Sequence, residues 1–139
     1  MESFLVDTTF WVARFNALDR DHAAAMRFLE EVRGRRRPPY RPVITDYVFD
    51  EVVTTLLTRT RRHDIAAEAG RALRQSPGLR MIRILARDFD EAWELFLERG
   101  DKQWSFTDCT SFTVMDREGM RTALSFDPNF TQAGFARLP

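Results

Sequence analysis

Two aspartates each follow a short apolar segment of the kind that forms a buried strand. Asp7 comes directly after residues 4–6, and Asp127 comes directly after residues 122–126. Because the carboxyl ends of parallel strands lie at one edge of a sheet, where such folds bind ligands, we expect the two carboxylates to lie close together. Carboxylates gathered in this way are ligands for hard divalent cations. The alternative is ordinary turn chemistry, since aspartate favours turns after strands and Asp127 precedes Pro128.

A third acid, Asp108, stands three residues after Ser105 in the sequence SFTD. This pattern is typical of a capping box, in which the carboxylate of Asp108 accepts a hydrogen bond from the backbone N–H of Ser105. A carboxylate in the first turn of a buried helix can also face the edge of the sheet. The sequence therefore allows both a capping role and a role in a site.

Two adjacent acids, Asp50 and Glu51, lie in a predicted helix over residues 46–60 that Thr45 can cap. Neither acid belongs to the apolar face of that helix, so helical periodicity does not choose between them. That face comprises Phe49, Val52, Val53 and Leu56. A solvated helix surface is the simpler interpretation of both acids.

Several other kinds of site are excluded by missing motifs or partners. The chain contains no G-x-x-x-x-G-K-[ST] or G-x-G-x-x-G sequence for a phosphate-binding loop, and no G-x-S-x-G nucleophile elbow. Its single cysteine, Cys109, excludes an internal disulfide and a cysteine-based zinc site, and we expect a buried, inert thiol there. His22 and His63 are isolated and are expected at the starts of helices.

The elements that must position these acids follow from apolar periodicity and capping residues. Buried strands are predicted at residues 4–6, 43–44, 79–85, 122–126 and 135–138. Helices are predicted at residues 8–15, 20–32, 46–60, 64–74, 89–99 and 105–119, with Asp19 as the cap of the second. Residues 33–42 contain three prolines and are expected to form a connection. This alternation predicts an α/β fold, a three-layer α/β/α domain with a central parallel sheet of four to five strands.

Two of these helices have distinct patterns. In the helix over residues 89–99, the aromatic and leucine side chains are expected to face the core, and the glutamates to face solvent. The first set is Phe89, Trp93, Phe96 and Leu97, and the second is Glu91, Glu94 and Glu98. In the helix over residues 105–119, apolar residues lie on all sides, which predicts that this helix is mostly buried.

Length and composition limit the possible classes of protein. The chain has 139 residues, 44% of them apolar and 30% charged, which predicts one folded domain over residues 1–139. No apolar run approaches the ~20 residues of a membrane-spanning helix. The first residues lack the basic start and long apolar stretch of a signal peptide, so we expect a cytoplasmic protein that does not enter the membrane.

The charges sum to zero, with 21 basic and 21 acidic residues. A neutral chain does not coat nucleic acid by bulk charge. The charges are nevertheless segregated, because residues 33–41 carry five arginines and no acid. This segregation allows a local phosphate-binding face beside an acidic pocket.

Four segments of the chain, in order, resemble the PIN-domain family. LVDTTF at residues 5–10 resembles the start of these proteins, and ITDYVFDEV at residues 44–52 is similar to their segment with an essential glutamate. DKQWSFTDCTSF at residues 101–112 is similar to the most distinctive stretch of the bacterial VapC-like branch, and LSFDPNF at residues 124–130 resembles its end. Together the segments span nearly the whole chain.

The resemblance implies a metal-dependent ribonuclease that uses Mg²⁺ or Mn²⁺. Asp7, Glu51, Asp108 and Asp127 match the acidic quartet of the family, which favours Glu51 over Asp50 and gives Asp108 a role in the site. We expect Asp7 and Asp108 to hold the first metal ion, and Asp127 and Glu51 to complete its water shell or support a second ion. Family members are typically toxins of toxin–antitoxin pairs, commonly homodimers that a small antitoxin protein holds inactive.

An RNA substrate also requires basic contacts outside the acids. Arg59, Arg61 and Arg62, after the helix that carries Glu51, are expected to hold the RNA backbone, with the arginine-rich connection as the alternative. Two other functions remain open, a catalytically inactive PIN-like binding module and a metal-dependent phosphatase. Intact acids at all four positions argue against the first, and the missing nucleophile motif and phosphate loop argue against the second.

Overall fold

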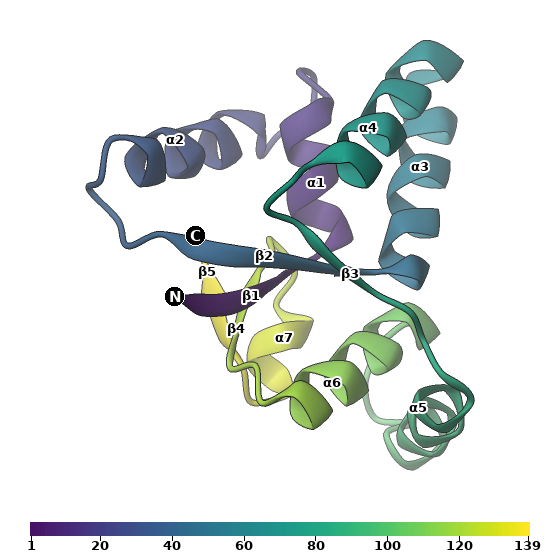
Figure 1. Ribbon diagram of the computed structural model, residues 1–139. Coiled ribbons are helices and arrows are strands. Elements are labelled where there is room, and N and C mark those ends of the chain that lie inside the picture. Colours follow the sequence, from purple (N-terminus) through teal and green to yellow (C-terminus); the bar gives the residue numbers. More distant parts are fainter.

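A five-stranded parallel sheet forms the middle layer of the protein in the computed structural model, which describes residues 1–139 (Figure 1). In chain order, the strands are β1 (Glu2–Val6), β2 (Tyr40–Thr45), β3 (Arg80–Ile82), β4 (Thr122–Leu124) and β5 (Ala136–Leu138). Their order across the sheet is β3-β2-β1-β4-β5, and every neighbouring pair is parallel. The first strand is therefore central, with β4 beside it.

Helices cover both faces of this sheet (Figure 1). They are α1 (Thr8–Phe15), α2 (His22–Arg33), α3 (Asp46–Thr60), α4 (His63–Gln75), α5 (Ala86–Glu98), α6 (Phe106–Glu118) and α7 (Asn129–Gln132). The first four lie on one face and the last three on the other. The predicted three-layer α/β/α fold with a parallel sheet is confirmed. None of the helices combines the length and apolar character that a membrane crossing requires.

Each face of the sheet has its own hydrophobic core. Because neighbouring residues of a strand point to opposite faces, Leu5 and Val6 of β1 belong to different cores. Val6 lies in the core formed with α1 to α4, together with Phe10 and Leu56. Leu5 lies in the core formed with α6, together with Phe112. A sheet covered on both faces requires such continuous apolar strands.

Several helix ends lie where the sequence predicts them. The helices α1 and α3 have the predicted bounds, and Thr45 caps α3 by accepting a hydrogen bond from the backbone N–H of Val48 at 3.1 Å. Gly119 ends α6 with a φ of 69°, a left-handed conformation that glycine adopts easily. His22 and His63 begin α2 and α4, as expected.

Two predicted features around α2 are wrong. Asp19 does not cap this helix, because its carboxylate accepts a hydrogen bond from the backbone N–H of Asp21 at 2.9 Å, within the preceding turn. The connection after α2 is shorter than predicted, since β2 already begins at Tyr40. The ring of Tyr40 stacks on Phe4 of β1, with ring centroids 4.9 Å apart, and this contact extends the pairing of the two strands.

Two strands are shorter than predicted because polar side chains bind the backbone beyond their ends. The third strand ends at Ile82, and the N–H of Ile84 donates to the carboxylate of Asp46 at 2.9 Å. The fourth strand ends at Leu124, and the N–H of Phe126 donates to the hydroxyl of Thr9 at 2.9 Å. The four-residue helix α7 is not among the predicted elements.

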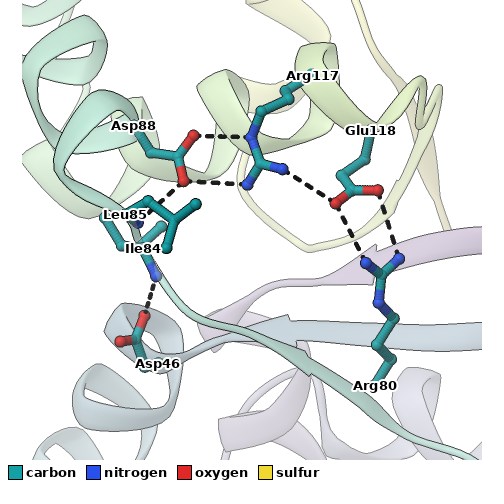
Figure 2. A network of polar contacts seen from close by, with 7 residues as sticks. All are labelled: Asp46, Arg80, Ile84, Leu85, Asp88, Arg117 and Glu118. Atoms are coloured by element: carbon teal, nitrogen blue, oxygen red, sulfur yellow. Dashed lines mark hydrogen bonds and ion pairs between the residues drawn. The ribbon is translucent and has the colours of Figure 1, made fainter.

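The burial predicted for α5 is wrong. Its apolar side chains Phe89, Trp93, Phe96 and Leu97 are 41% to 56% exposed. Asp88 and Ala92 are buried instead. Figure 2 shows the reason: the carboxylate of Asp88 accepts hydrogen bonds from two guanidinium nitrogens of Arg117 on α6, at 2.8 and 3.0 Å. This contact turns one side of α5 towards α6 and leaves the aromatic side outside. The glutamates of α5 are exposed, as predicted.

The same polar network joins α5 and α6 to the sheet (Figure 2). Arg117 also contacts Glu118, which pairs with Arg80 of β3 at 3.2 Å. Burial alone would raise the pKa of Asp88, but the hydrogen bonds from Arg117 and from the N–H of Leu85 outweigh it, and the pKa lies below its ordinary value. Asp88 is therefore ionised, and its contact with Arg117 fixes the position of α6, which is buried on most sides as predicted.

Candidate active site

Four acids predicted for the site come from four different elements. Asp7 directly follows β1, and Asp127 lies shortly after β4. Asp108 is in the first turn of α6, and Glu51 is in α3. Because β1 and β4 pair in parallel, with Val6 opposite Leu124, the segments that follow both strands leave the sheet at the same edge. The fold thus brings residues separated by more than 100 positions in the chain to one place.

Asp7 is buried, with 3% of its surface exposed. One of its carboxylate oxygens, Oδ2, accepts hydrogen bonds from the hydroxyls of Thr9 and Ser125, both at 2.9 Å. The other oxygen has no side-chain hydrogen-bond partner. Burial and the nearby charge of Asp108 raise the pKa of Asp7 to about 7, although the two hydroxyls act in the opposite direction.

Asp108 both caps α6 and belongs to the acid group. Its Oδ2 accepts a hydrogen bond from the N–H of Ser105 at 3.0 Å, and the hydroxyl of Ser105 accepts one from the N–H of Asp108 at 3.0 Å. This confirms the predicted capping box. Burial raises the pKa of Asp108, and the charges of Asp127 and Glu51 add to that effect. Since the cap uses Oδ2 alone, capping leaves Oδ1 available.

Asn129 links two of the acids and was not foreseen from the sequence. Its side-chain NH₂ group donates to Oδ2 of Asp108 at 3.0 Å and to Oδ2 of Asp127 at 3.3 Å. Its backbone N–H also donates to Oδ1 of Asp127 at 2.9 Å. The two carboxylates fix the orientation of the amide, because the reverse orientation would place its oxygen against negative charge.

Two hydroxyl groups, also absent from the sequence prediction, hold Asp7 against the segment that carries Asp127. The hydroxyl of Ser125 accepts a hydrogen bond from the N–H of Asp127 at 2.9 Å while it contacts Asp7. The hydroxyl of Thr9 contacts Asp7 and the N–H of Phe126, each at 2.9 Å. Together they fix the two strand ends relative to each other.

The structure distinguishes the two acids of α3. Glu51 is half-buried and close enough to Asp108 for its charge to raise the pKa of that group. Asp50 is exposed, and its carboxylate contacts only the hydroxyl of Thr54, at 3.5 Å. The helix therefore turns Glu51 towards the other acids and Asp50 towards solvent.

The four acids match a hard divalent cation in ligand type and charge, but their side chains are not close enough to enclose one. None of them forms an ion pair with an arginine or lysine, although two of them are buried. Carboxylate oxygens without a basic partner are the ligands that Mg²⁺ and Mn²⁺ take. No three of the side chains are close enough to form a closed ligand cluster. The donor set fits such an ion by type and by its uncompensated charge.

The other residues singled out in the sequence lie outside this group. The arginine-rich connection between α2 and β2 is at the amino end of β2, away from the acids at the carboxyl ends (Figure 1). Arg62 pairs with Asp64 at the start of α4. Cys109 is buried, and burial raises the pKa of its thiol to about 11, so the thiol is inert as expected.

The sequence and the fold are similar to those of known proteins. The sequence matches the PIN domain family over residues 4–136. It is 36% identical over 133 residues to the 23S rRNA-specific endonuclease VapC20 of Mycobacterium tuberculosis, covering 96% of this chain and 95% of that protein. The crystal structure of VapC20, described as a toxin that cleaves the sarcin–ricin loop, superposes with a TM-score of 0.83 at 34% identity over 96% of each chain.

More distant structures share the fold. VapBC2 from Rickettsia felis, solved with a promoter DNA fragment, superposes with a TM-score of 0.69 at 13% identity, covering 98% of this chain and 97% of that chain. FitAcB from Neisseria gonorrhoeae superposes with a TM-score of 0.64 at 14% identity, covering 98% and 96%.

Proposed function

The chain belongs to the PIN-domain family and to its VapC-like branch, and on that premise we propose that it is an endoribonuclease that hydrolyses RNA phosphodiester bonds with the help of Mg²⁺ or Mn²⁺. The observation that carries the proposal is the group formed by Asp7, Asp108, Asp127 and Glu51. Their charges interact, two of them are buried, and none has a basic partner. Such a group is costly to ionise unless a cation neutralises it.

Each acid has a proposed role that follows from its contacts. Asp7 and Asp108 each have one oxygen without a side-chain hydrogen-bond partner, and these oxygens would hold the metal ion. Asp127 and Glu51, at the rim, would orient its water shell or support a second ion. A bound ion of this kind supplies a water of lowered pKa and neutralises charge on the scissile phosphate.

The neighbouring polar residues position the acids. The hydroxyls of Thr9 and Ser125 fix one oxygen of Asp7 and leave the other without a side-chain hydrogen-bond partner. Asn129 holds Asp108 and Asp127 at a constant separation. Partners that orient ligating carboxylates commonly matter nearly as much as the ligands themselves.

We propose a structured ribosomal RNA as the substrate and an antitoxin protein as the partner. The substrate proposal is supported by 36% identity to a 23S rRNA-specific endonuclease across nearly the full length of both chains. The partner proposal is supported by fold similarity to the VapBC2 and FitAcB assemblies. On this view residues 1–139 form a single toxin domain of a toxin–antitoxin pair, acting in the cytoplasm.

The exposed apolar side of α5 supports a homodimer. Its members are Leu85, Phe89, Trp93, Phe96 and Leu97, which recur at helical spacing and are 41% to 56% exposed. Trp93 stacks on Phe96, and both Phe89 and Trp93 make T-shaped contacts with Phe106 at the start of α6. A contiguous aromatic surface of this kind marks an interaction site on a water-soluble domain. We propose that a second copy of the chain covers it.

One assay separates this function from the two alternatives. The protein is incubated with a hairpin RNA that contains the sarcin–ricin loop, with a scrambled hairpin and with a phosphomonoester, each with and without Mg²⁺. Metal-dependent cleavage of the first RNA supports the proposal. Hydrolysis of the phosphomonoester alone would indicate a phosphatase, and binding without hydrolysis would indicate an inactive binding module.

A further inference from the structure

A cavity of about 600 Å³ lies directly beside the acids. Thr9 and Asp127, both part of the acid site, line one side of it. The other side is formed by the turn between α1 and α2 and by Arg59 near the end of α3. Its volume lies within the ~300–1,000 Å³ of small-ligand sites. A ligand in this cavity would touch both the acid site and Arg59.

Two basic residues, Arg20 and Arg59, line this cavity, and Arg59 is the less exposed of the two. Its guanidinium has one partner, Asp19, and the Nη1–Oδ2 distance of 3.7 Å is longer than a hydrogen bond. The side chain is 62% exposed. By contrast, Arg62, one turn further along the chain, makes a two-point contact with Asp64. The N–H groups of Arg59 are therefore free to bind an anion.

Arg59 lies on the same helix as one of the acids, Glu51. Arg59 follows Glu51 by eight residues on α3, so about 12 Å of helix rise separates their backbones. Asp127 lines the cavity together with Arg59, and its carboxylate would repel the backbone of an RNA that runs from the acids into the cavity. A guanidinium at the far side of the cavity offsets that repulsion, because its planar group binds a phosphate through two hydrogen bonds.

Asp19 sets how strongly Arg59 can act. The carboxylate of Asp19 is largely buried and is held in the turn by the N–H of Asp21 at 2.9 Å. From this fixed position it orients the guanidinium and competes with any anion for it. The other basic residue of the cavity, Arg20, is 90% exposed and contacts Asp21 at 3.5 Å, so it is less restrained.

We propose that this cavity is a subsite for an RNA phosphate next to the scissile one, with Arg59 as its ligand and Asp19 as the residue that tunes it. The inference rests on the proposed ribonuclease function and adds the substrate contact that the acids themselves cannot make. It assigns to Arg59 the role that the sequence distributes over Arg59, Arg61 and Arg62.

The test uses opposite charge changes on the two residues. In Arg59→Gln, the apparent KM for the sarcin–ricin-loop hairpin should rise about tenfold with little change in kcat, and the slope of log KM against log salt should fall by roughly one unit. In Asp19→Asn, which keeps the hydrogen bond to Asp21, KM should fall because the competing charge is removed. Arg62→Gln, a matched change outside the cavity, should behave like the wild type.

A binding measurement separates this inference from the proposed function. Fluorescence anisotropy with the same labelled hairpin, in an Asp7→Asn background that does not cleave it, reports affinity without catalysis. Weaker binding in Arg59→Gln and tighter binding in Asp19→Asn support the subsite, even if the wild type proves to cleave no RNA. If wild-type protein cleaves the hairpin while Arg59→Gln and Arg62→Gln bind it equally, the subsite is contradicted and the ribonuclease function stands. If Arg59→Gln loses only antitoxin binding, the RNA subsite is also contradicted. That result would indicate that the cavity binds a peptide of the antitoxin.

Discussion

The side-chain amide of Asn129 lies between Asp108 and Asp127 and donates one hydrogen bond to each, at 3.0 and 3.3 Å. The two carboxylates come from α6 and from the segment after β4, and no other side chain bonds to both. The amide therefore sets the spacing of these acids and partly offsets their mutual repulsion.

Asn129→Ala should weaken the response to metal more than it weakens the fold. Without the amide, Asp108 and Asp127 repel each other and lose their fixed orientation, so the Mg²⁺ concentration for half-maximal RNA cleavage should rise by roughly 10–100-fold. Thr131→Ala, an exposed change on the same short helix, serves as the control. An unchanged Mg²⁺ requirement in Asn129→Ala would show that the amide does not position the acids.

Glu51 and Asp50 form a natural matched pair. Glu51→Gln should reduce cleavage strongly because it removes a half-buried charge that interacts with Asp108, whereas Asp50→Asn changes an exposed carboxylate. The turnover rates of the two variants on the same RNA provide the comparison. Equal, small losses would mean that α3 contributes only a solvated surface here.

The raised pKa of Asp7 predicts how metal affects stability. The folded pKa is about 7, against ~3.9 for an unfolded aspartate, so the folded state binds this proton more tightly. Protonation of Asp7 therefore stabilises the folded state. This contribution is complete below about pH 4 and is lost as the pH rises towards 7. Since a cation binds the ionised carboxylate, Mg²⁺ should raise Tm more near pH 8 than near pH 5.

Thermal unfolding with and without Mg²⁺ at the two pH values measures this difference directly. In Asp7→Asn, which keeps the shape but does not ionise, most of the pH dependence of the Mg²⁺ effect should disappear. A Tm increase of the same size at both pH values in the wild type would contradict a role for Asp7 as a metal ligand.

The exposed aromatic surface of α5 predicts that the protein is a homodimer. Trp93→Glu places a charge in the middle of the exposed aromatic surface and should convert a dimer into a monomer in sedimentation experiments. Glu91→Gln, a charge change of the same size among the exposed glutamates of the helix, should leave the dimer intact. A wild-type protein that stays monomeric at micromolar concentration and above would rule out this surface as a dimer contact.

Periodicity and capping predict the elements well because both are local. The bounds of α1 and α3 and the capping box of α6 follow from residues within one or two turns. The orientation of α5 does not, since an amphipathic pattern identifies an apolar side without saying what covers it. The ion pair between Asp88 and Arg117, 29 residues apart, decides that orientation.

The polar contacts of the site could not be predicted from the sequence, for a similar reason. Thr9 and Ser125 are 116 residues apart and meet only because β1 and β4 pair in parallel. Asn129 becomes a bridge only once α6 places Asp108 beside it. Residue types and strand ends can indicate where acids gather, whereas the neutral groups that hold them depend on the complete fold.

If the acids perform metal-dependent RNA cleavage, substitution of Asp108 should abolish it without loss of the fold. Asp108→Asn keeps the shape of the side chain and its capping oxygen but removes a charged ligand. Because burial and the charges of Asp127 and Glu51 raise the pKa of Asp108, its ionised form destabilises the fold at neutral pH, and the variant should unfold at the same or a higher temperature.

The decisive measurement is the Mg²⁺-dependent cleavage rate of the sarcin–ricin-loop hairpin by Asp108→Asn, with Asp116→Asn, an exposed change on the same helix, as the control. We predict that Asp108→Asn loses activity on the order of 100-fold or more, beyond the 10–100-fold typical of an outer-shell partner, while the control keeps it. Full activity in a folded Asp108→Asn protein would show that Asp108 is not a metal ligand in this reaction.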